Sequence, residues 1–327
     1  MRPFQYVRAK GVDDAVVAMR GGAKCLAGGT NLVDLMKGDI EQPRVLVDIR
    51  RLPLARLTDT PDGGVRIGAL MSNSDLAQHP SIRQRYPLLS QALLAGASPQ
   101  LRNMATVGGN LMQRTRCYYF TDRSFEACNK RAPGSGCAAR AGYNRIHAIF
   151  GASEHCVATH PSDMCVALAA LDAVVEVQGS AGARSIPLSD FHRLPGDTPE
   201  LDTNLKPDEL IVAVTLPPPA FGSNVHYLKV RDRASYAFAL VSVAAAVAWR
   251  AGSVEDARVV LGGVAHKPWR VPEAERALIG GRLEPPALEA AGEAATRGAQ
   301  ALRDNGFKIV LARRAVEQAV RTAGGRA

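Results

Sequence analysis

Four cysteines lie in one stretch in the middle of the chain that has little regular pattern of apolar residues. They are Cys117, Cys128, Cys137 and Cys156. Thiolates bind zinc and iron–sulfur clusters. Structural zinc sites usually include a pair of cysteines separated by about two to four residues, and the loop contains no such pair. The spacing disfavours zinc without excluding it. A metal is favoured over four thiols that are simply buried.

The cysteine loop also carries most of the excess positive charge. Residues 102–145 contain eight lysines and arginines against Asp122 and Glu126, a net charge of +6 (8 − 2), in a chain of net charge +9. This charge would offset the negative charge of a four-thiolate cluster and raise its potential. The alternative is an ordinary solvated face of little energetic consequence. Aromatic residues make up only 5% of the chain, and the basic residues elsewhere are scattered, so a nucleic-acid partner is not expected.

Two glycine pairs stand where a turn enters a predicted helix. They occur in Leu26-Ala27-Gly28-Gly29-Thr30-Asn31-Leu32 and in Ala105-Thr106-Val107-Gly108-Gly109-Asn110. Paired glycines let backbone N–H groups approach a phosphate, and the N-terminus of a helix favours an anion. Either turn alone is more simply an ordinary connection. Together they favour a dinucleotide-sized ligand held by its pyrophosphate. The chain has no G-x-G-x-x-G, so an NAD-binding Rossmann site is not supported.

Three further polar residues are candidates for the same ligand. Ser162 is a plausible helix N-cap, and Asp163 beside it can hold ribose hydroxyls or a phosphate. Lys229 lies in a predicted strand, where it either presents a cation to the ligand or is an ordinary strand-edge lysine. The histidines that flank the cysteine loop are His147, His155 and His160. They are not assigned as ligands, because four thiolates are already available.

The elements that must position these residues are predicted from periodicity and turn signals. Strand, helix, strand, helix and strand are expected in turn at 4–7, 12–20, 24–27, 31–37 and 45–49, which favours a small parallel unit. Further strands are expected at 65–70, 174–177 and 184–186, and helices at 88–97 and 164–171. Pro217, Pro218 and Pro219 mark a boundary. Beyond it we expect strands at 225–231, 239–249 and 257–264 and helices from 272, at 288–302 and at 309–320.

The bulk composition is that of an ordinary globular protein, with 46% apolar and 22% charged residues in 327. No apolar run reaches the roughly 20 residues that span a bilayer, so no membrane partner is expected. The N-terminus shows no signal peptide, which predicts a cytoplasmic protein unless a partner carries an export signal. Six cysteines are too few for a disulfide scaffold. Cys25 and Cys165 are interpreted as buried thiols.

These motifs together resemble the FAD-binding medium subunits of the xanthine dehydrogenase (molybdenum hydroxylase) family, over essentially the whole chain. The resemblance is carried by the two glycine turns, by Pro161-Ser162-Asp163 with the helix that follows, and by Lys229-Val230-Arg231 with Val241-Ser242-Val243-Ala244. Most such subunits lack the roughly forty residues that carry the cysteines. The insertion is most similar to that of the 4Fe-4S-containing FAD subunit of periplasmic aldehyde oxidoreductases, and 4-hydroxybenzoyl-CoA reductases share such an insertion.

The resemblance implies an α+β fold. Residues 1–219 would form a two-lobed FAD-binding domain of the PCMH/VAO type, with lobes at about 1–55 and 56–219 and a cluster insertion at 112–158. Residues 220–327 would form an α/β domain like the CO dehydrogenase flavoprotein C-terminal domain, with a three-stranded antiparallel sheet and a helix bundle. FAD would contact Leu26, Ala27, Gly28, Gly29, Thr30, Asn31, Leu32, Thr106, Gly109, Asn110, Ser162, Asp163 and Lys229. A 4Fe-4S cluster would take Cys117, Cys128, Cys137 and Cys156 as its ligands.

The resemblance further implies a heterotrimer. A large subunit would hold the molybdenum cofactor and oxidise an aldehyde, and a small subunit would hold two 2Fe-2S clusters. This chain would pass electrons through FAD to an external acceptor, with no side chain acting as acid, base or nucleophile. Export on a partner's signal would place the complex in the periplasm. Two alternatives remain: a 4-hydroxybenzoyl-CoA reductase-like subunit with the same cofactors, and a zinc-stabilised binding protein with no redox role.

Overall fold

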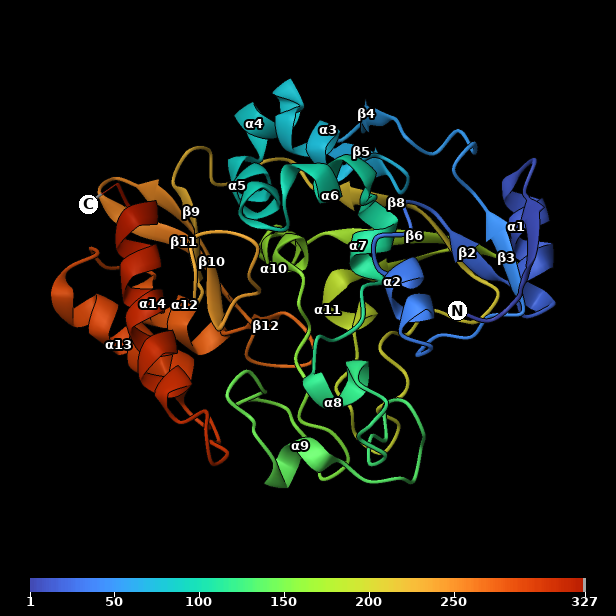
Figure 1. Ribbon diagram of the computed structural model, residues 1–327. Helices are drawn as coiled ribbons and strands as arrows, with labels where there is room; N and C mark the ends of the chain where they lie inside the picture. Colours follow the sequence, from blue (N-terminus) through green and yellow to red (C-terminus); the bar gives the residue numbers. More distant parts are fainter. Residues whose placement is uncertain (326–327) are drawn as a thin grey trace.

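The computed structural model describes residues 1–325 and contains three separate β-sheets (Figure 1). The N-terminal lobe is a three-stranded parallel sheet in the order β1 (Gln5–Arg8), β3 (Val45–Asp48) and β2 (Lys24–Leu26). Helices α1 (Val12–Arg20) and α2 (Leu32–Lys37) connect the strands. This is the predicted parallel unit, and its apolar residues form a small core of their own.

The second sheet has five antiparallel strands in the order β4-β5-β8-β6-β7. Their bounds are β4 Leu57–Asp59, β5 Val65–Gly68, β6 Val174–Gly179, β7 Gly182–Pro187 and β8 Leu210–Leu216. Its helices are α3 Asn73–Gln78, α4 Pro80–Arg85, α5 Pro87–Ala95, α6 Pro99–Met104, α7 Val107–Leu111, α10 Asp163–Ala170 and α11 Leu188–Phe191. Strand β8 lies between β5 and β6, so chain from both sides of the cysteine loop shares one sheet and one core.

The third sheet belongs to the C-terminal part of the chain. It has the order β12-β11-β10-β9 and is antiparallel, with β9 Val225–Val230, β10 Val241–Arg250, β11 Ser253–Gly262 and β12 Trp269–Arg270. The three predicted strands are present, and the two-residue strand β12 is a fourth that the sequence analysis did not predict. Helices α12 (Pro272–Leu278), α13 (Pro285–Thr296) and α14 (Phe307–Ala323) cover it (Figure 1).

The predicted helix at 288–302 is wrong in its bounds. Helix α13 begins at Pro285, because proline is tolerated in the first turn, where the missing N–H would have no partner. It ends at Thr296. Two residues later Gly298 adopts a positive φ of 78°, a left-handed conformation that stops the helix and that glycine adopts without steric cost.

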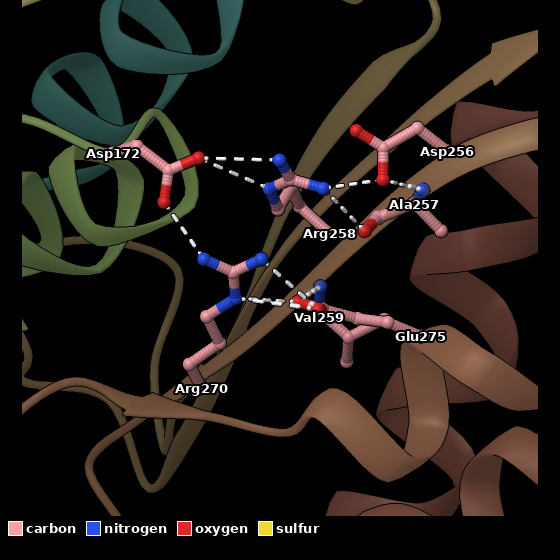
Figure 2. A network of polar contacts seen from close by, with 7 residues as sticks. All are labelled: Asp172, Asp256, Ala257, Arg258, Val259, Arg270 and Glu275. Carbon is pink, nitrogen blue, oxygen red and sulfur yellow. Dashed lines mark hydrogen bonds and ion pairs between the residues drawn. The ribbon is translucent and has the colours of Figure 1, made fainter.

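A polar network ties the end of α10 to the C-terminal sheet (Figure 2). The carboxylate of Asp172 accepts hydrogen bonds from Arg258 on β11 at 3.2 Å and from Arg270 on β12 at 2.7 Å. Glu275 on α12 accepts from Arg270 at 2.9 Å and from the backbone N–H of Val259 at 3.1 Å. Arg270 contacts both Asp172 and Glu275, and Arg258 contacts both Asp172 and Asp256. The network therefore joins the second and third sheets with every charge paired.

Helices α8 (Tyr118–Thr121) and α9 (Ala138–Ala141) of the cysteine loop lie at the lower edge of the view in Figure 1, whereas Ile149 and Phe150 of the same loop pack in the core of the C-terminal sheet. The regular structure of the loop is limited to these two helices, with an isolated bridge between Cys128 and Cys137. A separate small core forms where the loop packs on Leu35 of α2. No helix within residues 1–325 is long and apolar enough to cross a bilayer.

Candidate cofactor site

The first glycine turn offers a row of free backbone donors. Gly28 and Gly29 follow β2, and among the described residues the N–H groups from Gly28 to Leu32 have no hydrogen-bond partner. Gly29 adopts a positive φ of 73°, which glycine tolerates. Asn31 occupies the N-cap position of α2, but its side chain does not cap the helix. Successive unpaired N–H groups make an anion-binding concavity, so this turn fits a pyrophosphate.

The second glycine turn is built differently. The N–H of Val107 donates to Met71 O at 3.0 Å and that of Gly108 to Ala69 O at 2.8 Å. Thr106 caps α7 by accepting from the N–H of Gly109 at 3.2 Å. The backbone donors of this turn are therefore already used, and only its side chains at Thr106 and Asn110 remain for a ligand. The expectation that both turns offer the same backbone cradle is wrong for this one.

The two turns are nevertheless adjacent. A Cβ added to Gly28 would lie 1.7 Å from the carbonyl oxygen of Met104 and 3.3 Å from the nitrogen of Ala105. Only glycine allows the first turn to contact the segment that leads into Thr106. The close approach brings Thr106 and Asn110 toward the free N–H groups.

The predicted residues of α10 and β9 also meet. Ser162 caps α10 and donates a hydrogen bond to Asn110 Oδ1 at 2.6 Å. This bond joins the start of α10 to the second glycine turn. Asp163 accepts from Lys229 Nζ at 2.8 Å and from the Tyr227 hydroxyl at 2.7 Å. The Lys229 side chain is only 4% exposed and also donates to Ala95 O at 3.1 Å. Lys229 therefore fixes Asp163 and is not a free cation.

Tyr227 is a residue that the sequence analysis missed. It lies two positions before Lys229 on β9, and residues two apart in a strand face the same side. The two-residue spacing from Lys229 could therefore have indicated from the sequence that Tyr227 lies on the same face of the strand as Lys229. Burial and the neighbouring carboxylate of Asp163 raise the pKa of Tyr227 well above its usual value, so the hydroxyl remains a donor to Asp163.

The four loop cysteines line one partly open cavity. Burial raises the pKa of Cys117 to about 12 and that of Cys156 to about 11, and it also raises the pKa of Cys137. The other residues that line the cavity are Thr115, Tyr119, Phe120, Ala127, Asn129, Lys130, Ala139, His155 and Ala158. Four thiols from separate parts of the loop thus converge on one space, and this donor set fits an iron–sulfur cluster.

The sulfur spacing argues against a single zinc ion at the cavity. With Zn–S bonds of about 2.3 Å and tetrahedral angles, the four sulfurs of a zinc site lie about 3.8 Å apart. Within residues 1–325, no three of the loop cysteines have sulfurs that all lie within 4.8 Å of one another. The four sulfurs are therefore not arranged around a single zinc ion in the described chain.

The positive charge of the loop is paired with carboxylates, all but one of which lie outside the loop. Asp202 lies 2.7 Å from Arg114 and 2.5 Å from Lys130, and Glu41 lies 2.7 Å from Arg114. The other loop pairs are Arg116 with Asp34, Arg123 with Asp39, Arg140 with Glu154 and Arg145 with Asp232. The proposed +6 environment is therefore largely neutralised, and the electrostatic effect inferred from the loop alone is overestimated.

His147 contacts a predicted metal ligand, although the sequence analysis left it unassigned. Its Nε2 lies 3.1 Å from the sulfur of Cys117, and the ring is 1% exposed. Its carbonyl accepts from Lys308 Nζ at 2.8 Å and from Asn305 Nδ2 at 3.2 Å. Burial lowers the pKa of His147 to about 4, so the ring is neutral. Its partners are distant in sequence, so no local pattern could have revealed the contact.

Comparisons with known proteins cover the whole chain. Residues 2–219 match the family model of the FAD binding domain in molybdopterin dehydrogenase, and residues 226–322 match that of the CO dehydrogenase flavoprotein C-terminal domain. The chain is 53% identical over 317 residues to the aldehyde oxidoreductase FAD-binding subunit PaoB of Escherichia coli (strain K12), with 96% of each chain covered. It belongs to the FAD-binding medium subunits of the molybdenum hydroxylase family.

Other members of the molybdenum hydroxylase family agree in sequence and fold. The glyceraldehyde dehydrogenase medium chain of Sulfolobus acidocaldarius is 29% identical over 282 residues, with 86% of this chain and 82% of that chain covered. A solved structure of carbon monoxide dehydrogenase from Hydrogenophaga pseudoflava superposes with a TM-score of 0.78 at 27% identity, covering 100% of this chain and 99% of that chain. The predicted α+β fold and the predicted family are confirmed. The residue-level FAD contacts and the cysteine ligands stay predictions.

We expect Gly28→Ala to lower the FAD content of the purified protein severalfold, because the new methyl group meets the backbone carbonyl of Met104 and must separate the two turns. The ratio of flavin absorbance to protein measures this. Gly11→Ala is the matched control, because Gly11 precedes a helix and has open space at its Cβ position. Unchanged flavin content in Gly28→Ala would contradict the proposed contact between the turns.

Proposed function

We propose that this chain is the FAD- and 4Fe-4S-containing electron-transfer subunit of a molybdenum-dependent aldehyde oxidoreductase. It would receive electrons from the 2Fe-2S clusters of a small subunit and deliver them to an external acceptor, while a large subunit oxidises the aldehyde. The convergence of four cysteines on one cavity supports the cluster. The 53% identity to an aldehyde oxidoreductase FAD-binding subunit supports the substrate class.

The chain's own groups would hold the flavin in the following way. The unpaired N–H groups of Gly28 to Leu32 bind the pyrophosphate, with Thr106 and Asn110 beside them. Asp163 would accept hydrogen bonds from the ribose hydroxyls. Its carboxylate is held in place by hydrogen bonds from Lys229 and Tyr227. When bound, FAD supplies two-electron and one-electron redox chemistry that no side chain of the protein provides. The protein contributes position and electrostatics, and no acid, base or nucleophile is required.

In the second site, Cys117, Cys128, Cys137 and Cys156 would be the cluster ligands. Backbone contacts shape the part of the loop that carries two of them. Asn129 N donates to Gly136 O at 2.7 Å, and Gly136 N donates to Asn129 Oδ1 at 2.8 Å. Gly136 adopts a φ of 94°, which permits this reciprocal pair without strain. The turn brings Cys128 and Cys137 opposite each other. When bound, a cubane cluster supplies one-electron transfer.

Two alternatives differ from this proposal in testable ways. A 4-hydroxybenzoyl-CoA reductase-like subunit would hold the same cofactors, and a panel of aldehydes and aromatic CoA thioesters offered to the assembled complex separates the two. A zinc-stabilised binding protein is disfavoured by the sulfur spacing. Periplasmic location on a partner's export signal is also part of the proposal, and fractionation of cells that express the whole complex tests it.

The cofactor content is tested by spectroscopy. We expect aerobically purified protein to show flavin bands and a broad iron–sulfur shoulder, with about four iron atoms per chain, as a 4Fe-4S cluster requires. Cys137→Ser should abolish the EPR signal of the reduced cluster while most FAD remains bound. Cys25→Ser, at a partly buried thiol that does not line the cavity, is the matched control. Colourless protein with stoichiometric zinc, or full iron content in all four loop Cys→Ser variants, would contradict the proposal.

The contact of His147 predicts a change in potential. Hydrogen bonds to cluster sulfurs raise the reduction potential, so His147→Ala should lower the cluster midpoint potential by tens of millivolts in an EPR-monitored redox titration. His147→Gln can still donate an N–H and should restore part of the loss. His155→Gln is the control, because His155 lines the same cavity but is half exposed. Equal potentials in wild type and His147→Ala would show that the contact does not tune the cluster.

A further inference from the structure

A second group of metal-ligating side chains lies outside the flavin turns and the cysteine cavity. It consists of His160, Cys165 and His192, whose nitrogen and sulfur ligand atoms all lie within 4.8 Å of one another. Among residues 1–325 it is the one group of three or more such side chains with this spacing. His160 follows the cysteine loop, Cys165 lies in α10, and His192 follows α11. All three side chains are at least nine-tenths buried.

Each of the two imidazoles has a ring nitrogen that no group in the described chain contacts by a hydrogen bond. His192 Nε2 lies 3.0 Å from the carbonyl oxygen of Leu111. A carbonyl can only accept, so Nε2 carries the hydrogen and Nδ1 of the neutral ring is left as an acceptor. His192 Nδ1 and His160 Nε2 are both buried without a hydrogen-bond partner. The two ring centroids are 4.2 Å apart. Buried polar atoms without partners are rare and require an explanation such as an ion or a water.

The contact with Leu111 is also the arrangement that metal-binding histidines show. Such a histidine almost always donates its other N–H to a carbonyl or carboxylate, which fixes the tautomer and the orientation of the ring.

We propose that His160, Cys165 and His192 bind a soft monovalent cation, Cu⁺, at a structural site. One thiolate and two neutral imidazoles with Cu⁺ form a neutral unit, whereas Zn²⁺ would leave a net positive charge. Burying an uncompensated charge is costly. Thiolate and imidazole are both good ligands for copper. The bound ion would join the end of the cysteine loop, α10 and the segment after α11.

The test is an anaerobic titration of the full chain, loaded with FAD and its cluster, with Cu⁺ against a chromophoric competitor. We expect one equivalent of Cu⁺ in the wild type, and X-ray absorption at the copper edge should show mixed nitrogen and sulfur ligation. Cys165→Ser and His192→Gln should each weaken binding at least about 100-fold. Cys25→Ser is the matched control, because it removes another, partly buried thiol and leaves the group intact; it should keep the full equivalent.

The loop cysteines must not be mistaken for this site. The titration is therefore repeated in a background in which Cys117, Cys128, Cys137 and Cys156 are all replaced by serine, where the same single equivalent is expected. The inference is thus independent of the cluster, and failure of the proposed function leaves it standing. It is overturned if wild type binds no Cu⁺, if Cys165→Ser binds as tightly as wild type, or if diffraction at the copper edge shows an ordered water only between the two histidines.

Discussion

The cysteine loop depends on polar contacts with the rest of the protein, because it contains almost no secondary structure of its own. Within residues 112–158 only two four-residue helices, α8 and α9, are formed. Many of the remaining backbone groups are paired by turns within the loop, such as Ala132 N with Cys128 O at 2.8 Å. Arg131 donates to the carbonyls of Tyr119 and Phe120 at 2.7 and 3.0 Å. Asn144 and Asp304 exchange hydrogen bonds between backbone and side chain at 3.1 and 2.9 Å. The geometry of the cysteine cavity therefore depends both on polar contacts within the loop and on contacts with the C-terminal part of the chain.

Lys308 shows how far this dependence reaches along the chain. Its side chain is fully buried in α14, and burial lowers its pKa to about 7. The amine donates to the carbonyls of Ile146, His147 and Gly263 at 3.3, 2.8 and 2.6 Å. Desolvation of an ammonium group costs several kcal/mol unless hydrogen bonds offset it. The three carbonyls provide that offset, and in return the C-terminal helix fixes the backbone that places His147 against Cys117.

Periodicity and turn chemistry were sufficient for most of the fold, because strands such as Val45–Asp48 and helices such as α14 bury a regular face. The two glycine turns and Ser162 were also recognisable from the sequence, because glycine favours tight turns and serine favours the N-cap position of a helix. The surroundings of the cysteines were not predictable in the same way. Asp202 pairs with Arg114 and Lys130, which lie 88 and 72 residues away in the sequence. His147 contacts Cys117, which lies 30 residues away. A charge count over a sequence window cannot include such partners.

One hydrogen bond explains how such a large insertion coexists with the flavin turns. Asn110 ends the second turn, Ser162 begins α10, and their side chains are 2.6 Å apart. The cysteine loop thus leaves and re-enters the FAD-binding lobe at a single point. The entropic cost of closing a loop grows only slowly with its length, so the loop can be long without disturbing its anchors. Gly28, Asp163 and Lys229 lie outside it and are held by contacts of their own. The residues proposed to hold the flavin are therefore positioned by contacts that do not involve the four loop cysteines.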